Sequence, residues 1–174
     1  SLLVDAPQDF GGYRPGNFDQ HFRGPVTARD ALQQSLNIPA VALLEALGPT
    51  RFSAHLTHAG APLRLPHGVE PNLGMILGGT EARLEDLVGL YAALHREGLT
   101  ARPRLSDEMA VDERRLLTPG AAWIVRQMLA DETRPGALDE RIDHSRRSGL
   151  AWKTGTSYGF RDSWAIGAAA GASI

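Results

Sequence analysis

The sequence contains no cysteine, a single lysine and few aromatic residues, which make up 6% of its 174 residues. The absence of cysteine excludes disulfide bonds, thiol catalysis and metal sites built on thiolates. A formal net charge of −2, with no block of basic residues, gives no reason to expect nucleic acid as a partner. No apolar run approaches the roughly 18–20 residues that a membrane-spanning helix needs. With 43% apolar residues, the chain has the composition and length of one globular domain.

The one lysine, Lys153, stands in a stretch with an unusual set of functional groups, KTGTS over residues 153–157. All other basic side chains are arginines, which suggests that this position needs a compact ammonium group. Three hydroxyl side chains lie within the next four positions, and Gly155 would let a ligand or another backbone approach closely. On a β-strand, Lys153 and Gly155 would share one face, and Thr154 and Thr156 the other. The stretch is therefore a candidate site for a carboxylate or a developing oxyanion.

Apolar periodicity and capping residues predict a helical chain that ends in a hairpin. Thr27 followed by Asp30 resembles a capping box, and Thr80 and Thr118 precede longer amphipathic patterns. The predicted helices cover residues 27–34, 40–47, 50–59, 80–97 and 118–129. The predicted strands cover residues 149–156 and 162–168. The stretches 1–25, 60–79, 99–116 and 134–148 are expected to be loops.

A second candidate site lies between the first two predicted helices, where Ser35 and Asn37 could project a hydroxyl and an amide into a cleft. Pro39 interrupts the helical pattern there, because proline biases the residue before it away from the helical conformation. Taken alone, serine and asparagine at a helix end are more often capping residues than catalytic ones. The interpretation of this site depends on what accompanies it in the sequence.

Both candidate sites occur in the order and context of a known enzyme family. Ser-x-Asn followed by Lys-Thr-Gly resembles the motif set of class A β-lactamases and penicillin-binding proteins. The intervening sequence is similar to penicillin-binding transpeptidase domains in several stretches: YRPGNFD at 13–19, GPVTARDAL at 24–32, SLNIPAV at 35–41, and LGG at 77–79 with EARLEDL at 81–87. The resemblance covers residues 1–167 and is greatest to the class A bifunctional peptidoglycan synthases.

The resemblance implies an α/β (α+β) fold of the β-lactamase/transpeptidase type, with a helical subdomain and an antiparallel sheet. It also implies a nucleophilic serine in a Ser-x-x-Lys motif upstream of Ser35. The sequence contains no such motif, because Leu150 stands three residues before its only lysine. We therefore expect residues 1–174 to be part of a transpeptidase domain, with an incomplete sheet, and with the nucleophile segment and the final strand or strands outside the sequence. The low-complexity end, residues 168–174, is expected to be frayed or non-native.

The catalytic residues that the resemblance implies within this sequence are Ser35, Asn37 and Lys153. Ser35 would relay protons between the absent serine–lysine pair and the leaving amine. Asn37 would position the substrate amide and the absent lysine. Lys153 would supply positive charge to the cleft and hold Ser35 by a hydrogen bond. Without the nucleophile, the chain alone is predicted to be inactive.

The substrate-binding residues that the resemblance implies are Thr154, Gly155 and Thr156. The two threonine hydroxyls would bind the substrate carboxylate, and the backbone N–H of Thr156 would form half of the oxyanion hole. The implied partners are peptidoglycan stem peptides that end in D-Ala-D-Ala, β-lactam antibiotics and other cell-wall synthesis proteins. No cofactor, metal or nucleic acid is implied. The full-length protein would also be a glycosyltransferase, held on the periplasmic side of the bacterial inner membrane by an N-terminal transmembrane helix outside this sequence.

Two other functions and one alternative site stay open at this point. One is a serine β-lactamase or D,D-carboxypeptidase relative, and another is a non-catalytic binding module that kept the fold and lost the serine. An in-frame Ser-x-x-Lys upstream of residue 1 would distinguish the segment of an enzyme from such a module. His55 and His58 have a spacing that suits a metal-binding helix face, but no third ligand is evident, which favours an ordinary histidine pair.

Overall fold

The computed structural model describes residues 2–104, 106, 108–130, 149–157, 161–169 and 172–173, and every structural statement below concerns these residues. The helices are α1 (Ala28–Gln33), α2 (Asn37–Leu47), α3 (Pro49–His58), the 3-10 helix η1 (Leu73–Leu77), α4 (Leu84–Ala92) and α5 (Pro119–Ala130). The strands are β1 (Leu2–Asp5), β2 (Gly24–Thr27), β3 (Leu99–Ala101), β4 (Glu113–Arg115), β5 (Ala151–Thr156), β6 (Ser163–Ala169) and β7 (Ala172–Ser173). The predicted mixture of helices and antiparallel strands is confirmed.

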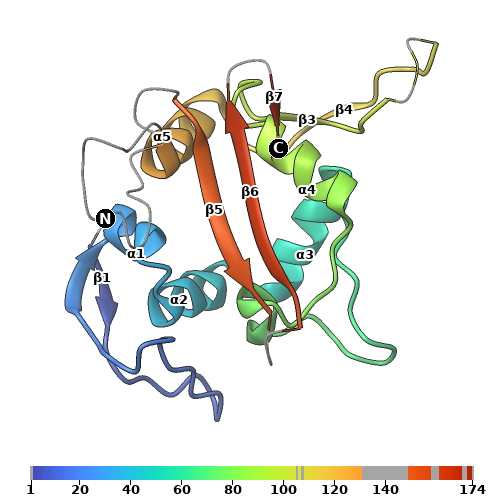
Figure 1. The fold of residues 1–174 in the computed structure, drawn as a ribbon. Coiled ribbons are helices and arrows are strands. Elements are labelled where there is room, and N and C mark those ends of the chain that lie inside the picture. The colour runs from blue at the N-terminus through green and yellow to red at the C-terminus, as the bar shows by residue number, and fades with distance from the viewer. Residues whose placement is uncertain are drawn as a thin grey trace.

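The longest sheet has the order β5-β6-β7 and is antiparallel throughout. β5 and β6 pair from Ala151 opposite Ala168 to Thr156 opposite Ser163. In Figure 1 these two strands run side by side, with α1, α2 and α5 on the side of β5 and α3 and α4 on the side of β6. The hairpin predicted at the end of the chain is thus confirmed, whereas its predicted turn at residues 158–160 lies outside the described residues.

Two smaller antiparallel sheets are not predicted by the sequence pattern. β1 pairs with β2 from Leu2 opposite Thr27 to Asp5 opposite Gly24, within a stretch expected to be a loop. β3 pairs with β4 in the same way, again where the sequence predicts a loop. These strands have three or four residues each, which is too short for an alternating pattern to be recognised.

Helix α1 begins as the capping box predicts. The Thr27 hydroxyl oxygen accepts a hydrogen bond from the Asp30 backbone N–H at 3.1 Å, and the Asp30 carboxylate accepts one from the Thr27 N–H at 3.4 Å. Helix α2 begins at Asn37, three residues earlier than predicted. Pro39 fits inside its first turn, because the first N–H groups of a helix have no partner within the helix.

The prediction that Thr80 caps the fourth helix is wrong, because α4 begins only at Leu84. The segment before it is held extended by paired backbone hydrogen bonds, each 2.9 Å long, between Arg64 and Glu81. Helix α5 begins at the predicted position, where the Thr118 hydroxyl oxygen accepts a hydrogen bond from the Ala121 N–H at 3.3 Å. A capping residue therefore starts a helix only where tertiary pairing does not compete.

The buried side chains form separate clusters that hold the helices against the strands. Leu94, Leu129 and Ala151 make one cluster, which joins the C-terminal end of α4 to α5 and β5. Phe10, Ile38 and Val41 make another cluster. It joins α2 to the N-terminal loop, which is the segment 6–23 between β1 and β2, and side chains of η1 pack against it. These clusters fix the start of α2 and the strand β5, the two places that carry the predicted site.

The end of the chain is partly ordered in the sheet. Ala168 and Ala169 of β6 pair with Ser173 and Ala172 of β7, so these four residues are paired where a frayed end was expected. The predicted charged loop at 134–148 lies within residues that the structure does not describe. Among the described residues, none of the helices is long and apolar enough to cross a membrane.

Candidate active site

Ser35 lies in the connection between α1 and α2 and has a left-handed backbone conformation, with φ of 53°. The Leu36 N–H donates to the Ala31 carbonyl at 2.9 Å, and the Ser35 N–H donates to the Leu32 carbonyl at 3.2 Å. These two bonds define a Schellman motif, which ends a helix with one left-handed residue that is usually glycine. The buried contact between Leu36 and Ala31 completes the motif. A serine here carries a backbone penalty of about 1–2 kcal/mol, which a glycine would avoid.

Lys153 lies in β5, half-buried and opposite Ile166 of β6. Its Nζ donates hydrogen bonds to the Oγ of Ser35 and to the Thr154 carbonyl oxygen, the latter at 3.1 Å. The Ser35 hydroxyl and the Lys153 ammonium thus meet although they stand 118 positions apart in the sequence. The lone lysine and the strained serine form one polar pair at the surface.

The other residues of the lysine motif lie toward the end of β5. Thr154, Gly155 and Thr156 are exposed, and a Cβ added at Gly155 would meet no atom within 4 Å. In the described sheet, β5 is an edge strand, with β6 on one side only. An edge strand offers backbone donors and acceptors to an extended ligand. Hydroxyls, an ammonium group and open backbone together suit a ligand with a carboxylate.

The Asn37 side chain is hydrogen-bonded to the N-terminal loop. Its Nδ2 donates to the Gly16 carbonyl oxygen at 2.7 Å, and its backbone N–H donates to the Oδ1 of Asn17 at 2.8 Å. The structure therefore joins Asn37 to the N-terminal loop, beside the pair of Ser35 and Lys153. The sequence pattern gives no role to Asn17, although its place in a Pro-Gly-Asn turn is a signal of an ordered loop.

The end of β5 is held by two contacts that the sequence pattern does not reveal. The Ser157 N–H donates to the Asp162 carbonyl at 3.0 Å, and the Asp162 N–H donates to the Ser157 Oγ at 2.9 Å. On the other side lies Gly78, with φ of 88°, where an added Cβ would be 3.2 Å from the Cα of Ser157. Gly78 is therefore explained by its close approach to the residue after β5, whereas a Cβ at Gly79 would lie 2.7 Å from the Gly74 carbonyl oxygen.

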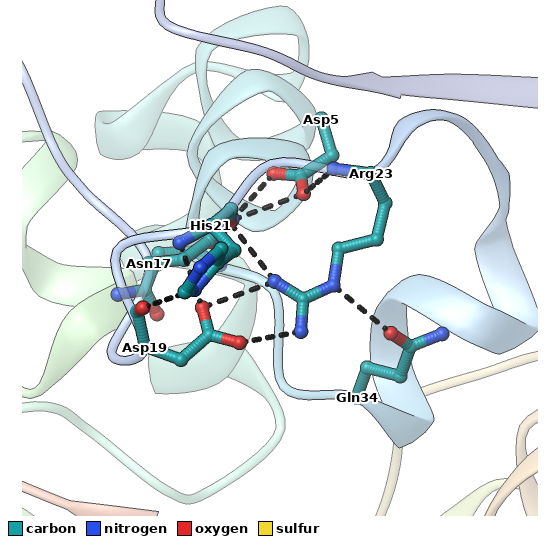
Figure 2. A network of polar contacts seen from close by, with 7 residues as sticks. Asp5, Asn17, Asp19, His21, Arg23 and Gln34 are labelled. Carbon is teal, nitrogen blue, oxygen red and sulfur yellow. Dashed lines mark hydrogen bonds and ion pairs between the residues drawn. The ribbon is translucent and has the colours of Figure 1, made fainter.

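The N-terminal loop, between β1 and β2, carries a polar network, shown in Figure 2. The Arg23 guanidinium donates to both carboxylate oxygens of Asp19 and to the His21 carbonyl, and its Nε donates to Gln34. The donation from Arg23, with a further one from the His21 N–H, holds the pKa of the Asp19 carboxyl well below its usual range. The network fastens the loop onto the C-terminal end of α1, one residue before Ser35.

The alternative histidine site does not come together as a metal centre in the described residues, where no group of three or more His, Cys, Asp or Glu side chains could hold an ion. The Nε2 of His55 lies 2.7 Å from the Leu116 carbonyl oxygen, which gives this ring a structural partner. Of the predicted site residues, Ser35 and Lys153 contact each other directly, and Asn37, Thr154, Gly155 and Thr156 flank them in the sequence.

Curated proteins similar to this chain are penicillin-binding proteins, whereas no protein-family model matches it. Penicillin-binding protein 1C of Escherichia coli is 52% identical over 167 residues, covering 96% of this chain and 21% of that protein. Penicillin-binding protein 1B of Vibrio cholerae is 29% identical over 191 residues, covering 96% of this chain and 23% of that protein. The chain thus spans about a fifth to a quarter of the length of these relatives.

Solved structures with the same fold are also penicillin-binding proteins. PonA1 from Mycobacterium tuberculosis in complex with penicillin V matches with a TM-score of 0.71 at 21% identity, over 99% of this chain and 52% of that chain. Penicillin-binding protein 1A from Haemophilus influenzae matches with a TM-score of 0.73 at 18% identity, over 96% of this chain and 32% of that chain. The expected β-lactamase/transpeptidase-like fold is confirmed, with sheets that are incomplete in this chain.

Proposed function

The chain belongs to the penicillin-binding proteins, and on that premise we propose that it forms the substrate-holding part of a peptidoglycan D,D-transpeptidase domain. The observation that carries the proposal is the hydrogen bond from the Lys153 ammonium to the Ser35 hydroxyl. That contact unites the two candidate motifs into one site. A fold that only needed a helix end at position 35 would favour glycine there, so the strained serine supports a chemical role.

The nucleophile of this domain lies in a segment that precedes the chain in the full-length protein, called the parent below. The sequence holds no Ser-x-x-Lys motif, and it spans only about a fifth of its relative of 52% identity. The parent is therefore a larger, class A protein in which a preceding segment supplies the serine and its lysine, and another domain supplies glycosyltransfer. Peptidoglycan lies outside the cytoplasm, and the similarity to penicillin-binding proteins supports a parent that is anchored in the membrane and faces the periplasm.

The reaction is a two-step acyl transfer. The nucleophilic serine attacks the carbonyl carbon of the penultimate D-alanine of a stem peptide. The amide bond to the terminal D-alanine breaks, and this D-alanine leaves as an amine that has gained the serine proton. The amine of a second stem peptide then attacks the ester, an amide cross-link forms, and the serine regains a proton. A β-lactam acylates the same serine when its ring amide opens.

The described residues serve this reaction in distinct ways. Ser35 relays the proton between the nucleophile and the leaving amine, and Lys153 keeps the Ser35 hydroxyl in place and adds positive charge. Asn37 orients the substrate amide through its Oδ1, because its Nδ2 already donates to the Gly16 carbonyl oxygen. In the edge strand, Thr154 and Thr156 bind the substrate carboxylate with their hydroxyl groups, and the Thr156 N–H donates to the developing oxyanion. The exposure of both threonines in an edge strand supports this assignment.

Labelling with a fluorescent penicillin tests the proposal. The parent should form a covalent adduct that survives denaturation, whereas this chain alone should form none, because its sequence lacks the nucleophile motif. Mapping of the adduct should place it on a serine that precedes residue 1. Labelling of the isolated chain would contradict the assigned place of the nucleophile. A parent that takes no label at all would favour a non-catalytic module.

A further inference from the structure

The carboxylate of Asp5, at the end of β1, is completely buried. Its two oxygens accept hydrogen bonds from the Asn17 Nδ2 at 2.8 and 3.0 Å, and one of them also accepts from the backbone N–H of Arg23 at 2.9 Å. A buried carboxylate is stable only when such donors surround it, since desolvation of an unpaired charge is costly. Figure 2 shows Asp5 with its bonds to Asn17 and Arg23 as dashed lines.

Asn17 is itself buried, with 6% of its surface exposed, and both ends of its amide are occupied. Its Nδ2 donates to Asp5 and to the His21 carbonyl, the latter at 2.8 Å. Its Oδ1 accepts the backbone N–H of Asn37 at 2.8 Å. The amide thus has one defined orientation, because turning it over would place an oxygen against the Asp5 carboxylate.

The bond to Asn37 replaces a missing helix cap. The N-cap residue of α2 is Leu36, whose side chain cannot accept a hydrogen bond. The first N–H groups of a helix need partners from outside the helix, and Asn17 supplies one from a distant loop. Ser35 is therefore clamped from both sides, by the Schellman motif on the side of α1 and by Asn17 on the side of α2.

We propose that Asn17, anchored by Asp5, is a positioning residue that places the Ser35-Leu36-Asn37 segment against Lys153. This inference rests on the proposed transpeptidase function. The amide fixes where α2 begins, and this sets the position of the Ser35 hydroxyl relative to the Lys153 ammonium. Loss of the amide would let the connection between α1 and α2 shift while the fold persists.

The test measures the acylation rate constant of the parent with fluorescent penicillin, corrected for folded protein. Asn17→Ala should lower it by at least about tenfold, since a displacement of about 1 Å in a reacting group can cost 100-fold. Asn17→Asp should do the same, because it sets a carboxylate oxygen against the Asp5 carboxylate and against the His21 carbonyl oxygen. Asp5→Asn keeps one acceptor oxygen for the Asn17 amide, so it should lower the rate less than Asn17→Ala does.

A matched control separates positioning from a general loss of stability. Thr100 is buried in β3, with its hydroxyl near the carbonyl oxygens of Ala59 and Arg114 at 2.6 and 3.1 Å. Thr100→Val removes buried hydrogen bonds away from the site. It should lower the melting temperature and leave the corrected acylation rate within about twofold of wild type. If the Asn17 variants acylate at the wild-type rate, or if Thr100→Val lowers the rate as they do, the proposal is overturned.

A second measurement keeps this inference separate from the proposed function. Hydrogen exchange of the Asn37 backbone amide in the parent should accelerate in Asn17→Ala and stay near the wild-type rate in Thr100→Val. If the wild-type parent takes no penicillin label but the Asn37 amide behaves in this way, the transpeptidase proposal fails and Asn17 still positions the start of α2. An Asn37 amide that exchanges equally in wild type and Asn17→Ala overturns the positioning role.

Discussion

The Lys153 ammonium donates a hydrogen bond to the Ser35 hydroxyl, and Ser35 is held for it in a left-handed conformation. The two residues stand 118 positions apart in the sequence, one in a helix connection and the other in a β-strand. A glycine at position 35 would fit the backbone better and offer no hydroxyl. The backbone at position 35 is therefore less stable than it would be with glycine, and the polar contact with Lys153 is kept. Backbone strain of this kind is typical of functional sites.

The substitution Ser35→Gly should stabilise the fold and impair the proposed reaction. Removal of the Cβ from a left-handed residue should raise the free energy of unfolding by about 1 kcal/mol, because the left-handed penalty of about 1–2 kcal/mol exceeds the extra conformational entropy that glycine loses on folding. The same change removes the hydroxyl that Lys153 contacts, so the acylation rate of the parent should fall. Urea unfolding and penicillin labelling measure the two effects.

The matched comparison for this prediction is Ser35→Ala. Alanine also lacks the hydroxyl but keeps the Cβ, so it should lower the acylation rate without the gain in stability. A Ser35→Gly variant that is less stable than Ser35→Ala would contradict the assignment of position 35 to the Schellman motif.

The substitution Gly78→Ala should disturb the end of β5. The added Cβ would lie 3.2 Å from the Cα of Ser157, and φ at this position is 88°. Both effects are unfavourable, so we expect a loss of about 1–2 kcal/mol in the free energy of unfolding. Gly68→Ala is the control, because φ there is also positive, at 76°, and an added Cβ meets no atom within 4 Å. Equal losses for the two variants would show that Gly78 is not held against β5.

The cluster of Phe10, Ile38 and Val41 should be the main support of α2. Ile38 and Val41 are fully buried, so Ile38→Ala should cost about 2–5 kcal/mol and Ile38→Val about 0.5–1.5 kcal/mol. Chemical denaturation of the parent measures both. Leu43, on the same helix but 52% exposed, is the control, and Leu43→Ala should cost clearly less than Ile38→Ala. The reverse order would contradict the packing of α2 described above.

The ion pair of Asp19 and Arg23 should make the free energy of unfolding depend on pH. Arg23 lowers the pKa of the Asp19 carboxyl in the folded protein, so the folded state binds a proton there less readily than the unfolded state does. The resulting stabilisation is present above the ordinary pKa of about 4 and is lost as the pH falls further. Asp19→Asn should be less stable than wild type at pH 7, and the difference should shrink below about pH 4. A difference that stays constant with pH would contradict this role.

The sequence predicts best those elements whose signals are local. The capping box of Thr27 and Asp30, the helix start at Thr118 and the final hairpin all follow from neighbouring residues. Thr80 misleads because the distant pairing of Arg64 with Glu81 determines the backbone there. The β1–β2 pairing joins short segments far apart in the sequence, so local periodicity could not reveal it.

The site follows a similar rule. The lone lysine and the Ser-x-Asn motif mark Ser35 and Lys153 in the sequence, and the structure brings them into contact. Asn17 and Gly78 carry no such mark, because each acts through one partner that only the folded chain brings near. Supporting residues of this kind are identified from hydrogen bonds and close approaches, since no local pattern distinguishes them from ordinary loop residues.

Ser35 and Lys153 should act together in the acylation of the parent. The acylation rate constant for fluorescent penicillin, measured in wild type, Ser35→Ala, Lys153→Ala and the double variant, tests this joint action. We expect each single substitution to lower the rate by about 100-fold or more, and the double variant to be about as slow as the slower single one, because the two groups work as a unit. A Lys153→Ala parent that acylates at the wild-type rate would show that Lys153 has no part in acylation.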